Sequence, residues 1–383
     1  MANNNDNKVL NVPPLRFPEF SGEWKMCTIG ELTTKVGSGV TPRGGEAVYK
    51  TEGHPFVRSQ NVGLGNLLLD DIAFIDEETH LRQKNTELQF NDVLLNITGA
   101  SIGRSALVDK QIVGGNVNQH VCIIRTKENL VPSFICSFLL SNYGQRQIDS
   151  FQAGGNRQGL NFEQIKSIKI TIPSKDEQIK IAKLLRAIDE RIATQNKIID
   201  KLQSLIKGLR VCCMQRNGSN NVYLSEIAQI YQPQTISSAE LTEDGFLVYG
   251  ANGIIGKYKD YNHKTEQICI TCRGNTCGMV NYTKPMSWIT GNAMVINTDK
   301  YQDKVYKKYL YHYLSAYNFN SIISGSGQPQ IVRTPLEKLK ITLPTISEQK
   351  QKAMILDKIQ DKIEINHNIL NLYILQKQYL LRQ

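Results

Sequence analysis

Two long stretches of this chain carry apolar residues at alternating steps of three and four, which is the spacing of a coiled-coil seam. One polar residue interrupts each line, Gln195 in the first stretch and Asn366 at the matching place in the second. The apolar seam positions are Ile181, Leu185, Ile188, Ile192, Ile199, Leu202, Ile206 and Leu209 in the first stretch, and Leu356, Ile359, Ile363, Leu370, Tyr373 and Leu380 in the second. The pattern predicts two helices of about 38 residues, each about 57 Å long at 1.5 Å per residue.

The matched polar pair has two interpretations. A hydrogen bond between Gln195 and Asn366 would fix the register of the two helices at some cost in stability. Alternatively, both side chains face solvent where a short seam frays.

The segment that precedes each long helix is also repeated. Residues 168–173 read IKITIP and residues 339–344 read LKITLP, at an offset of 171, and Glu-Gln follows each segment at the same distance. A repeat of this length predicts that the protein consists of two copies of one unit.

A capping box is predicted at the start of each helix. Ser174 has Glu177 three residues later, and Thr345 has Glu348 in the same relation. In such a box the hydroxyl and the carboxylate satisfy backbone N–H groups that the first helical turn leaves unpaired.

The two globular stretches have mixed strand and helix patterns. Strands are predicted at 93–97, 121–124, 267–270 and 293–296, and helices at 132–149 and about 304–318. In both halves a Gly-rich turn follows that helix, at 153–158 and 325–330. The segment 13–18, with prolines at three of its six positions, is predicted to be extended and to lie against a neighbouring element.

The halves align within these stretches as well. Residues 98–103 match 273–278 at an offset of 175, with Gly99 and Gly103 against Gly274 and Gly278. Glycine at both ends of a five-residue turn predicts unusual backbone angles or a close backbone approach. Gly115-Asn116 matches Gly291-Asn292 at an offset of 176, so insertions fall in the loops while the helices keep register.

Composition is that of an ordinary soluble protein, with 40% hydrophobic and 21% charged residues and no apolar run long enough to span a bilayer. The polar first eleven residues and eight scattered cysteines predict a cytoplasmic protein with reduced thiols. The net charge of +10 suggests a polyanionic partner, but residues 1–173 are neutral. Residues 174–213 and 214–344 each carry +4, and 345–383 carry +2, so the helices and the second half hold the excess.

These features resemble one known family. The opening Leu15-Arg16-Phe17-Pro18 and the Pro-to-Glu-Gln signatures before both helices are similar to shared regions of the specificity subunits of type I restriction–modification enzymes. The layout of the whole chain resembles theirs. The resemblance implies an α/β (α+β) fold with two similar globular target-recognition domains, at 1–173 and 214–344. Two long spacer helices, at 174–213 and 345–383, join them as an antiparallel coiled coil with pseudo-two-fold symmetry.

The resemblance also implies the partners. They are double-stranded DNA, two methyltransferase subunits on the helical pair, and restriction subunits that bind through the methyltransferases, with no membrane association. S-adenosylmethionine, ATP and magnesium are expected only in those partner subunits. The chain itself contains no G-x-x-x-x-G-K-S/T phosphate loop, no G-x-S-x-G elbow, no H-E-x-x-H motif and no Asn-Pro-Pro-aromatic segment, so we expect no catalytic residues.

Cys269, Cys272 and Cys277, with His263 nearby, are candidate ligands of a metal site. Their spacing lacks the paired Cys and His ligands of structural zinc. At an offset of 175 the counterparts in the first half are the apolar Leu94, Ile97 and Ile102. We therefore predict no metal.

DNA-reading residues follow from the duplication. Arg, Lys, Asn and Gln side chains read base edges and hold phosphates. Residues shared by both halves, such as Gly99 with Gly274 or Asn116 with Asn292, are predicted to be scaffold, and loop residues that differ are candidates for readout. The candidates are Arg58, Gln60, Asn61, Arg104, Asn118, Gln119, Asn156, Arg157 and Gln158 in the first domain, and Asn252, Lys257, Arg273, Asn275, Gln328, Gln330 and Arg333 in the second. For any one of them, a solvated loop or turn role is the competing interpretation.

Two functional hypotheses remain at this point. The first is a non-catalytic subunit whose two domains read the halves of a bipartite, asymmetric DNA site while the helices set the spacing. The second is a coiled-coil scaffold whose globular domains bind protein rather than DNA, and the neutral first half favours it.

Overall fold

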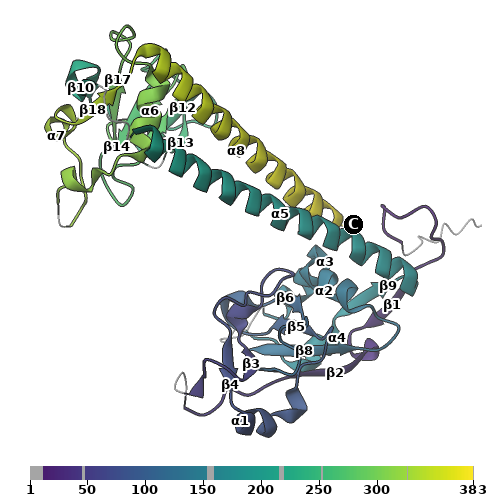
Figure 1. Ribbon diagram of the computed structural model, residues 1–383. Coiled ribbons are helices and arrows are strands. Elements are labelled where there is room, and N and C mark those ends of the chain that lie inside the picture. Colours follow the sequence, from purple (N-terminus) through teal and green to yellow (C-terminus); the bar gives the residue numbers. More distant parts are fainter. Residues whose placement is uncertain are drawn as a thin grey trace, which may run out of the picture. The chain divides into compact units, whose positions relative to one another are not determined.

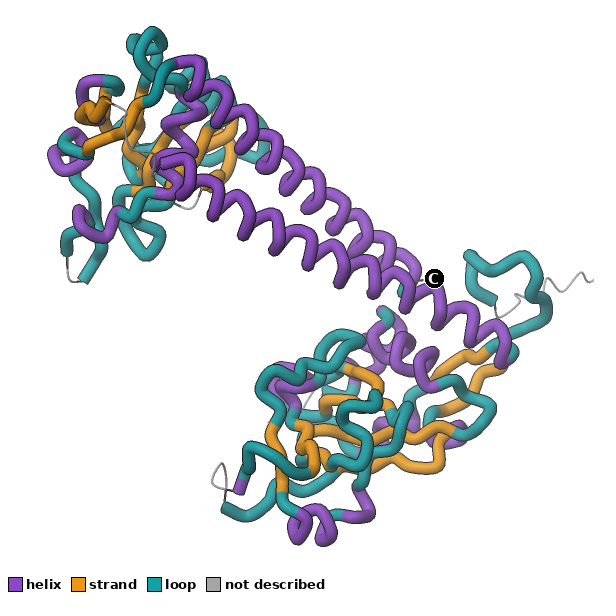
Figure 2. The backbone as a smooth tube through the Cα atoms, in the orientation of Figure 1, coloured by secondary structure: helices purple, strands orange, loops and turns teal. Residues whose placement is uncertain are grey.

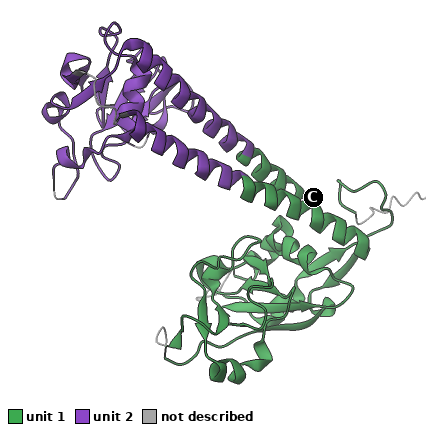
Figure 3. Ribbon diagram, in the orientation of Figure 1, with its two compact units in different colours: residues 1–194, 370–383 green, residues 195–369 purple. Residues whose placement is uncertain are grey.

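The computed structural model describes residues 12–44, 48–152, 159–214, 220–251, 253–325 and 327–382. The chain divides into two compact units, residues 1–194 with 370–383 and residues 195–369 (Figure 3). Both units contain a part of each long helix, α5 (Lys175–Met214) and α8 (Ile346–Leu380) (Figure 1). The helices begin close to the predicted boundaries at 174 and 345, whereas the units divide the chain inside the helices.

The first unit contains three sheets in its described residues. Strands β1 and β9 pair antiparallel, a four-stranded sheet has the order β2-β8-β5-β6, and a three-stranded sheet has the order β4-β3-β7. The strands are β1 (Lys25–Thr28), β2 (Thr33–Ser38), β3 (His54–Val57), β4 (Ala73–Ile75), β5 (Val93–Asn96), β6 (Ser105–Leu107), β7 (Asn116–Val117), β8 (Val121–Thr126) and β9 (Lys169–Ile172). The helices are α1 (Glu77–Arg82), α2 (Pro132–Leu140), α3 (Asn142–Ser150) and α4 (Phe162–Ser167), with the short 3-10 helices η1 (Gly30–Leu32), η3 (Ser59–Asn61), η4 (Lys84–Thr86) and η5 (Gly99–Ser101).

The second unit repeats these sheets in its described residues. The orders are β10-β18, β11-β17-β14-β15 and β13-β12-β16. The strands are β10 (Asn220–Tyr223), β11 (Gln229–Tyr231), β12 (Phe246–Gly250), β13 (Gly253–Tyr258), β14 (Ile268–Thr271), β15 (Val280–Tyr282), β16 (Trp288–Ile289), β17 (Ala293–Asn297) and β18 (Lys340–Leu343). The helices are α6 (Lys307–Ala316) and α7 (Arg333–Glu337), with the 3-10 helices η6 (Leu224–Glu226), η7 (Ser238–Glu240) and η8 (Phe319–Ile322). The predicted duplication is thus present in the strand pairing, and the predicted strands fall on β5, β8, β14 and β17.

Each four-stranded sheet is covered on both faces, because alternate residues of a strand point to opposite sides. Val93 and Leu95 of β5 pack with the apolar side chains of α2 and α3, whereas Leu94 packs with Val57 of β3 and Val117 of β7. The second unit has the same arrangement on β14, where Ile268 and Ile270 pack with α6 and Cys269 packs with β12 and β16. Figure 2 shows helices and strands gathered in each globular part.

The helix predicted at 132–149 is two helices, so that prediction was wrong in one respect. The chain breaks at Ser141, whose backbone is extended with ψ of 163° and whose Oγ accepts a hydrogen bond from Gly144 N (3.2 Å). Ser141 is therefore the N-cap of α3, and a serine oxygen competes with the helical backbone in this way. The other predicted helix, about 304–318, is α6 and is shorter at both ends.

The glutamine of each repeated Glu-Gln pair, Gln178 or Gln349, has the same structural role in both units. Gln178 accepts a hydrogen bond from Val131 N (2.9 Å) and donates to Asn129 O and Pro173 O. Gln349 makes the same three bonds in the second unit, to Tyr306 N, Lys304 O and Pro344 O. Both side chains are buried. Each glutamine therefore fastens the start of a long helix to the globular part of its own unit.

The capping boxes differ between the copies. Thr345 and Glu348 form the predicted reciprocal box, with Thr345 N donating to Glu348 Oε2 (3.0 Å) and Glu348 N donating to Thr345 Oγ1 (3.4 Å). In the first copy Glu177 N donates to Ser174 Oγ (3.4 Å), but the Glu177 carboxylate binds Arg16 instead, with two contacts of 2.7 Å. These hydrogen bonds raise the pKa of the Arg16 guanidinium. The reciprocal half of the first box is therefore replaced by an ion pair.

That ion pair belongs to the predicted extended segment. Arg16 binds Glu177, Glu19 pairs with Lys180, and the Lys180 ammonium lies 4.5 Å from the ring centre of Phe17. The segment lies against the first turns of α5, as its prolines predict.

Helices α5 and α8 lie side by side and antiparallel. In the second unit, Ile206, Leu356 and Ile363 form a buried cluster, and Lys352 Nζ donates to Cys213 O (3.3 Å). Gln195 Nε2 donates to Asn366 O (3.2 Å) and to Asn366 Oδ1, and both residues are buried. The hydrogen-bonded interpretation of this pair is therefore correct, and the solvent-facing one is wrong. No helix among the described residues is both long and apolar enough to cross a membrane.

In the first unit the same helices meet through polar contacts as well as the seam. Asp189 Oδ1 lies 2.6 Å from Lys377 Nζ, and Arg191 Nη1 donates to Tyr373 OH (3.2 Å) while its guanidinium lies over the Tyr373 ring. The helix pair is thus held by polar as well as apolar contacts, and Arg191 contributes to this internal packing.

Candidate nucleic-acid interface

Two loops of the first unit leave the same edge of a sheet. Strands β3 and β7 are parallel, with Phe56 opposite Asn116 and Val57 opposite Val117. Because both strands end at that edge, η3 after β3 lies beside residues 118–120 after β7. Five of the candidates, Arg58, Gln60, Asn61, Asn118 and Gln119, therefore come together here.

A third loop joins them through side-chain hydrogen bonds. Asn96 at the end of β5 donates to Ser59 O (2.8 Å) and to Ser101 Oγ (3.1 Å). Thr98 Oγ1 lies 2.6 Å from His120 Nδ1. These contacts bring η5, and Arg104 after it, to the same place. We call residues 58–61, 98–104 and 118–120 the first loop cluster.

The second unit builds the equivalent edge. Strands β12 and β16 are parallel, with Tyr249 opposite Ile289. Ala251 O, just after β12, accepts hydrogen bonds from Thr271 Oγ1 (2.5 Å) and Thr276 Oγ1 (3.1 Å) of the turn after β14. Residues 328–330 join that turn through Gly274 N to Pro329 O (3.0 Å). We call residues 251, 272–278, 290–292 and 328–330 the second loop cluster.

The first-unit candidates differ in how free their side chains are. Asn61 is fully buried and donates to Leu68 O (2.9 Å) and Asp71 Oδ1 (2.9 Å), and Asn118 is buried with its Oδ1 accepting from His120 N (3.0 Å). Arg58 is partly buried and donates to Asp71 O (2.6 Å). Gln60, Arg104 and Gln119 are exposed. The buried amides of Asn61 and Asn118 therefore support the loops. The other three side chains are exposed and can meet a ligand, although Gln60 Nε2 also contacts Asp71 Oδ2 and Gln119 Oε1 accepts from Thr41 N (3.0 Å).

The second-unit candidates fall in two places. Arg273, Asn275 and Gln328 are exposed in the second loop cluster, and Gln330 is partly buried there. Lys257 lies opposite Leu247 near the other end of the β12–β13 hairpin, with its Nζ 3.3 Å from Asp244. Arg333 begins α7 and pairs with Glu337 (2.7 Å). The structure does not bring Lys257 to the loop cluster. Asn156, Arg157, Gln158 and Asn252 lie outside the described residues.

The shared glycines are scaffold, as the duplication predicts. Gly99 and Gly103 have φ of 72° and 83°, and Gly274 and Gly278 have φ of 87° and 90°. All four lie in the left-handed region that side chains with a Cβ rarely adopt. The two turns therefore share one backbone shape and differ in the side chains they carry.

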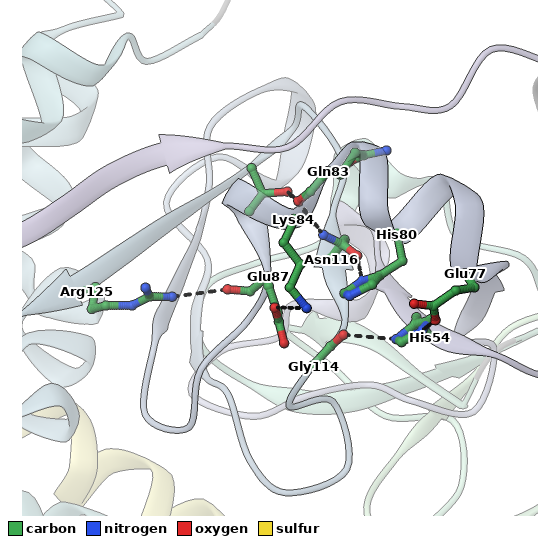
Figure 4. Close-up of polar contacts among 10 residues, drawn as sticks. His54, Glu77, His80, Gln83, Lys84, Glu87, Gly114, Asn116 and Arg125 are labelled. Atoms are coloured by element: carbon green, nitrogen blue, oxygen red, sulfur yellow. Dashed lines mark hydrogen bonds and ion pairs between the residues drawn. The ribbon is translucent and has the colours of Figure 1, made fainter.

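The predicted equivalence of Asn116 and Asn292 is wrong. Asn116 is fully buried in β7, where it donates to Gln83 O (3.0 Å) and Thr86 Oγ1 (3.2 Å) and its Oδ1 lies 2.7 Å from His80 Nδ1 (Figure 4). Asn292 is exposed and follows β16. Asn116 of β7 lies opposite Phe56 of β3, and Trp288 of β16 lies opposite Val248, the equivalent position of β12. Trp288 is therefore the counterpart of Asn116. The Gly-Asn match in the sequence was coincidental.

The three candidate zinc cysteines do not share one site. Cys269 is buried among Tyr249, Ile289 and Val295, whereas Cys272 is buried in the other core, and Cys277 packs against that core. Burial raises the pKa of the Cys269 thiol to about 12. Cys269 acts as a small apolar side chain. The Cys272 thiol lies on the other side of β14, where it donates to Asn292 O (3.2 Å) and accepts from Gln232 Nε2 (3.2 Å).

Comparison with known proteins decides the family. The model of the type I restriction modification DNA specificity domain matches this chain twice, over residues 21–204 and 217–372. The chain belongs to the type I restriction–modification specificity subunits.

Other proteins agree with this assignment. The specificity subunit is 23% identical to the putative type I restriction enzyme MjaX specificity subunit of Methanocaldococcus jannaschii, over 94% of this chain and 92% of that protein. Its fold is similar to the S subunit of the type I system of M. genitalium, with a TM-score of 0.65 and 16% identity over 94% and 95% of the two chains. A chain from a structure concerned with complex assembly and conformational transition of the type I system has a TM-score of 0.57, again at 16% identity, over 94% and 96%.

The family settles the choice between the two hypotheses. This specificity subunit has two target-recognition domains and recognises DNA, and the protein-binding scaffold is set aside. The sequence did not single out His120 in the first loop cluster, or Thr41, whose backbone N donates to Gln119 Oε1 (3.0 Å), and it misassigned Asn292 in the second. These positions are identified by which residues of neighbouring strands pair, and the sequence pattern does not show that pairing.

Proposed function

We propose that each target-recognition domain reads one part of a bipartite, asymmetric site on double-stranded DNA. One observation carries this proposal: the same three sheets and the same glycine-ended turn hold different side chains in the two loop clusters. The turn presents Arg104 at its end in the first domain, and Arg273 and Asn275 in the second. Because direct readout depends on the side chains at base edges, different loops on one framework favour two different half-sites.

The proposed readers are the exposed Arg, Asn and Gln side chains of the loop clusters. Arginine reads guanine, and asparagine or glutamine reads adenine, in bidentate geometry. Gln60, Arg104 and Gln119 take this role in the first domain, and Arg273, Asn275 and Gln328 take it in the second. Asn61 and Asn118 hold the loops, and basic side chains such as Lys257 and Arg333 suit phosphate contacts.

The long helices are proposed to set the distance between the half-sites. Helix α5 has 40 residues, which is about 60 Å at 1.5 Å per residue. At 3.4 Å per base pair this length corresponds to roughly 18 base pairs, an upper bound on the separation of the two readers. Residues 1–173 and 214–344 then act as the readers, and residues 174–213 and 345–383 as the spacer.

The same helices are proposed to dock two methyltransferase subunits. Outside the seam, α8 exposes a line of large apolar residues with seven-residue spacing, Ile365 (57% exposed), Leu372 (64%) and Tyr379 (56%). Helix α5 exposes Leu184, Ile198 and Leu205 on a line of its own. Apolar lines of this kind on a helix favour burial against a partner helix. The chain itself is then non-catalytic, and S-adenosylmethionine, ATP and magnesium bind in the partner subunits, with the restriction subunits joining through the methyltransferases.

Methylome sequencing of a host with and without the gene tests the readout. We expect one bipartite, asymmetric motif to lose its methylation when the gene is deleted. Purified assembly should also lose affinity for that DNA steeply as salt rises, because phosphate contacts release counterions. An unchanged methylome, or a continuous palindromic motif, would contradict the proposal.

Docking is tested separately by Leu372→Asp with Tyr379→Asp. Both residues are exposed, so the isolated chain should fold normally, whereas co-purification with methyltransferase subunits should be lost. His367→Asp places the same charge on an exposed position of α8 off the line and should leave assembly intact. Full assembly of the double variant would show that this line is not the docking surface.

A further inference from the structure

The two loop clusters can be superimposed residue by residue from their backbone hydrogen bonds. Three bonds recur with the same geometry in both domains. Asn118 N donates to Val57 O (3.1 Å), as Thr290 N donates to Tyr249 O (2.9 Å). Val121 N donates to Asn118 O (3.3 Å), as Ala293 N donates to Thr290 O (2.9 Å). Ile97 N donates to His120 O (3.0 Å), as Cys272 N donates to Asn292 O (3.0 Å). Residues 118–120 therefore correspond to 290–292, and Asn292 stands where His120 stands.

In the first domain the middle residue of this tripeptide, Gln119, carries the exposed side chain. Gln119 Oε1 accepts a hydrogen bond from Thr41 N (3.0 Å), which fixes the orientation of its amide because a backbone N–H can only donate. Gln119 Nε2 then donates to His120 Nε2 (3.1 Å), so His120 carries its proton on Nδ1 and donates it to Thr98 Oγ1 (2.6 Å). His120 is thus held inside the framework, and Gln119 is exposed and oriented by it.

In the second domain the middle position is Gly291, and a side chain there would collide with its neighbours as they stand. A Cβ on Gly291 would lie 2.4 Å from Thr235 Oγ1 and 3.0 Å from Pro233 O. Thr235 is the counterpart of Thr41. Ile230 pairs with Ile296 of β17 as Val36 pairs with Ile124 of β8, and each threonine lies five residues after that paired residue. The threonine that orients Gln119 in one domain therefore occupies the place of a side chain in the other.

The last residue of the tripeptide is consequently the free one in the second domain. Asn292 is exposed, and its amide has no hydrogen-bond partner among the described residues. Its backbone carbonyl accepts from Cys272 N, so the backbone beneath the side chain is fixed. An exposed amide on a fixed backbone offers one donor and one acceptor. These match the N7 acceptor and the N6 amino donor of adenine in the major groove.

We propose that Asn292 is a specificity-determining residue that reads a base, of adenine type, in the second half-site. The inference rests on the proposed function, in which the second domain reads its own half-site. The duplicated framework thus places an exposed amide on this tripeptide in each domain, Gln119 in the first and Asn292 in the second, at adjacent positions.

The test is Asn292→Ala in the full assembly with its methyltransferase subunits. The probe is a set of duplexes that vary each base pair of both half-sites, scored by methylation rate. Discrimination at one base pair of the second half-site should fall roughly 5- to 150-fold, which is the range for loss of one bidentate contact. The first half-site should be unchanged. Gln119→Ala should give the mirrored result, with relaxation confined to the first half-site.

Gln302→Ala is the matched control. Gln302 is an exposed amide after the far end of β17 and should leave both half-sites unchanged. Equal thermal unfolding of all variants establishes that the fold is kept, since the Asn292 side chain is exposed and only its backbone is bonded. Asn292→Asp gives a second reading, because a carboxylate can only accept and should shift preference toward cytosine.

The outcomes separate this inference from the proposed function. If Asn292→Ala leaves discrimination unchanged while the wild-type assembly reads a bipartite site, Asn292 is not a reader and the inference fails alone. If all sequences weaken equally and the salt dependence becomes shallower, Asn292 contacts a phosphate, and the inference fails. If the wild-type site is not bipartite, the proposed function fails first.

Discussion

The buried Gln195–Asn366 pair allows one energetic prediction to be worked from the structure. Gln195 is 8% and Asn366 9% exposed, in a seam whose neighbours Ile199 and Ile363 are 4% and 5% exposed. Gln195 donates to two oxygens of Asn366, and Asn366 Nδ2 donates to Lys362 O. The perturbation is Gln195→Met, which keeps the length of the side chain and removes its donor.

The magnitude follows from what is left behind. Asn366 Oδ1 then lacks its donor in a site closed to water, and an unsatisfied buried polar group costs about 1–3 kcal/mol. Asn366→Leu alone should cost less, because Gln195 Nε2 loses the Oδ1 acceptor but keeps the backbone carbonyl of residue 366. Replacing both residues removes both polar groups together and should be nearly neutral or stabilising. The double variant should therefore be more stable than the two single effects added, a coupling expected of residues in direct contact.

Hydrogen exchange of the helix amides is the suitable assay, because a chain with two compact units need not unfold in one step. A loss of about 2 kcal/mol corresponds to roughly 30-fold faster exchange, at tenfold for each 1.4 kcal/mol. The change should appear in peptides around 196–206 and 357–369. Asn368→Leu, an exposed Asn on the same helix, is the control and should stay within about 0.5 kcal/mol. Single variants that exchange at the wild-type rate would refute the reasoning.

Three further predictions concern modularity, spacing and pH. Exchange of residues 20–173 for those of another specificity subunit keeps the Arg16–Glu177 ion pair and moves β1 together with its partner β9. The methylome should then show a hybrid site with only the first half-site changed. A change in both half-sites would contradict independent reading. Four residues inserted in both helices, beside Gln195 and Asn366, add about 6 Å. The spacing between the two half-sites should widen by about two base pairs, with some loss of stability from the shifted seam. An unchanged spacing would show that the helices do not set the distance between the half-sites. Burial lowers the pKa of His312 and of His263 below the usual 6.5, so the unfolded chain binds these protons at a higher pH than the folded chain does. The contribution to the stability of the second unit is therefore fully present above about pH 6.5 and should fall as the pH drops below that value. Thermal melts against pH should show this slope and a shallower one for His312→Gln, and an equal slope would remove His312 from the explanation.

The duplication, the helix seam and the family can all be predicted from the amino-acid sequence. These depend on local signals, since seam spacing, capping residues and a repeated proline with Glu-Gln recur at fixed offsets along the chain. Ser141 shows the limit of such signals, because one serine that caps its own backbone divided a helix that the apolar pattern joined. The partner of Glu177 was equally hidden, as Arg16 lies far away in the sequence and is brought close by the segment that covers α5.

The equivalence of residues in the two domains, and the exposure of each candidate, come from the three-dimensional fold. Loops of different length shifted the sequence match, so Asn292 aligned with Asn116 although strand register places it with His120. Burial separated Asn61 and Asn118 from Gln60, Arg104 and Gln119, although all five are loop residues able to bind a base edge. The physical reason is that pairing across a sheet and closure from water are properties of distant segments brought together. Residue type reports which chemistry is possible at a position, and the fold decides whether a ligand can reach it.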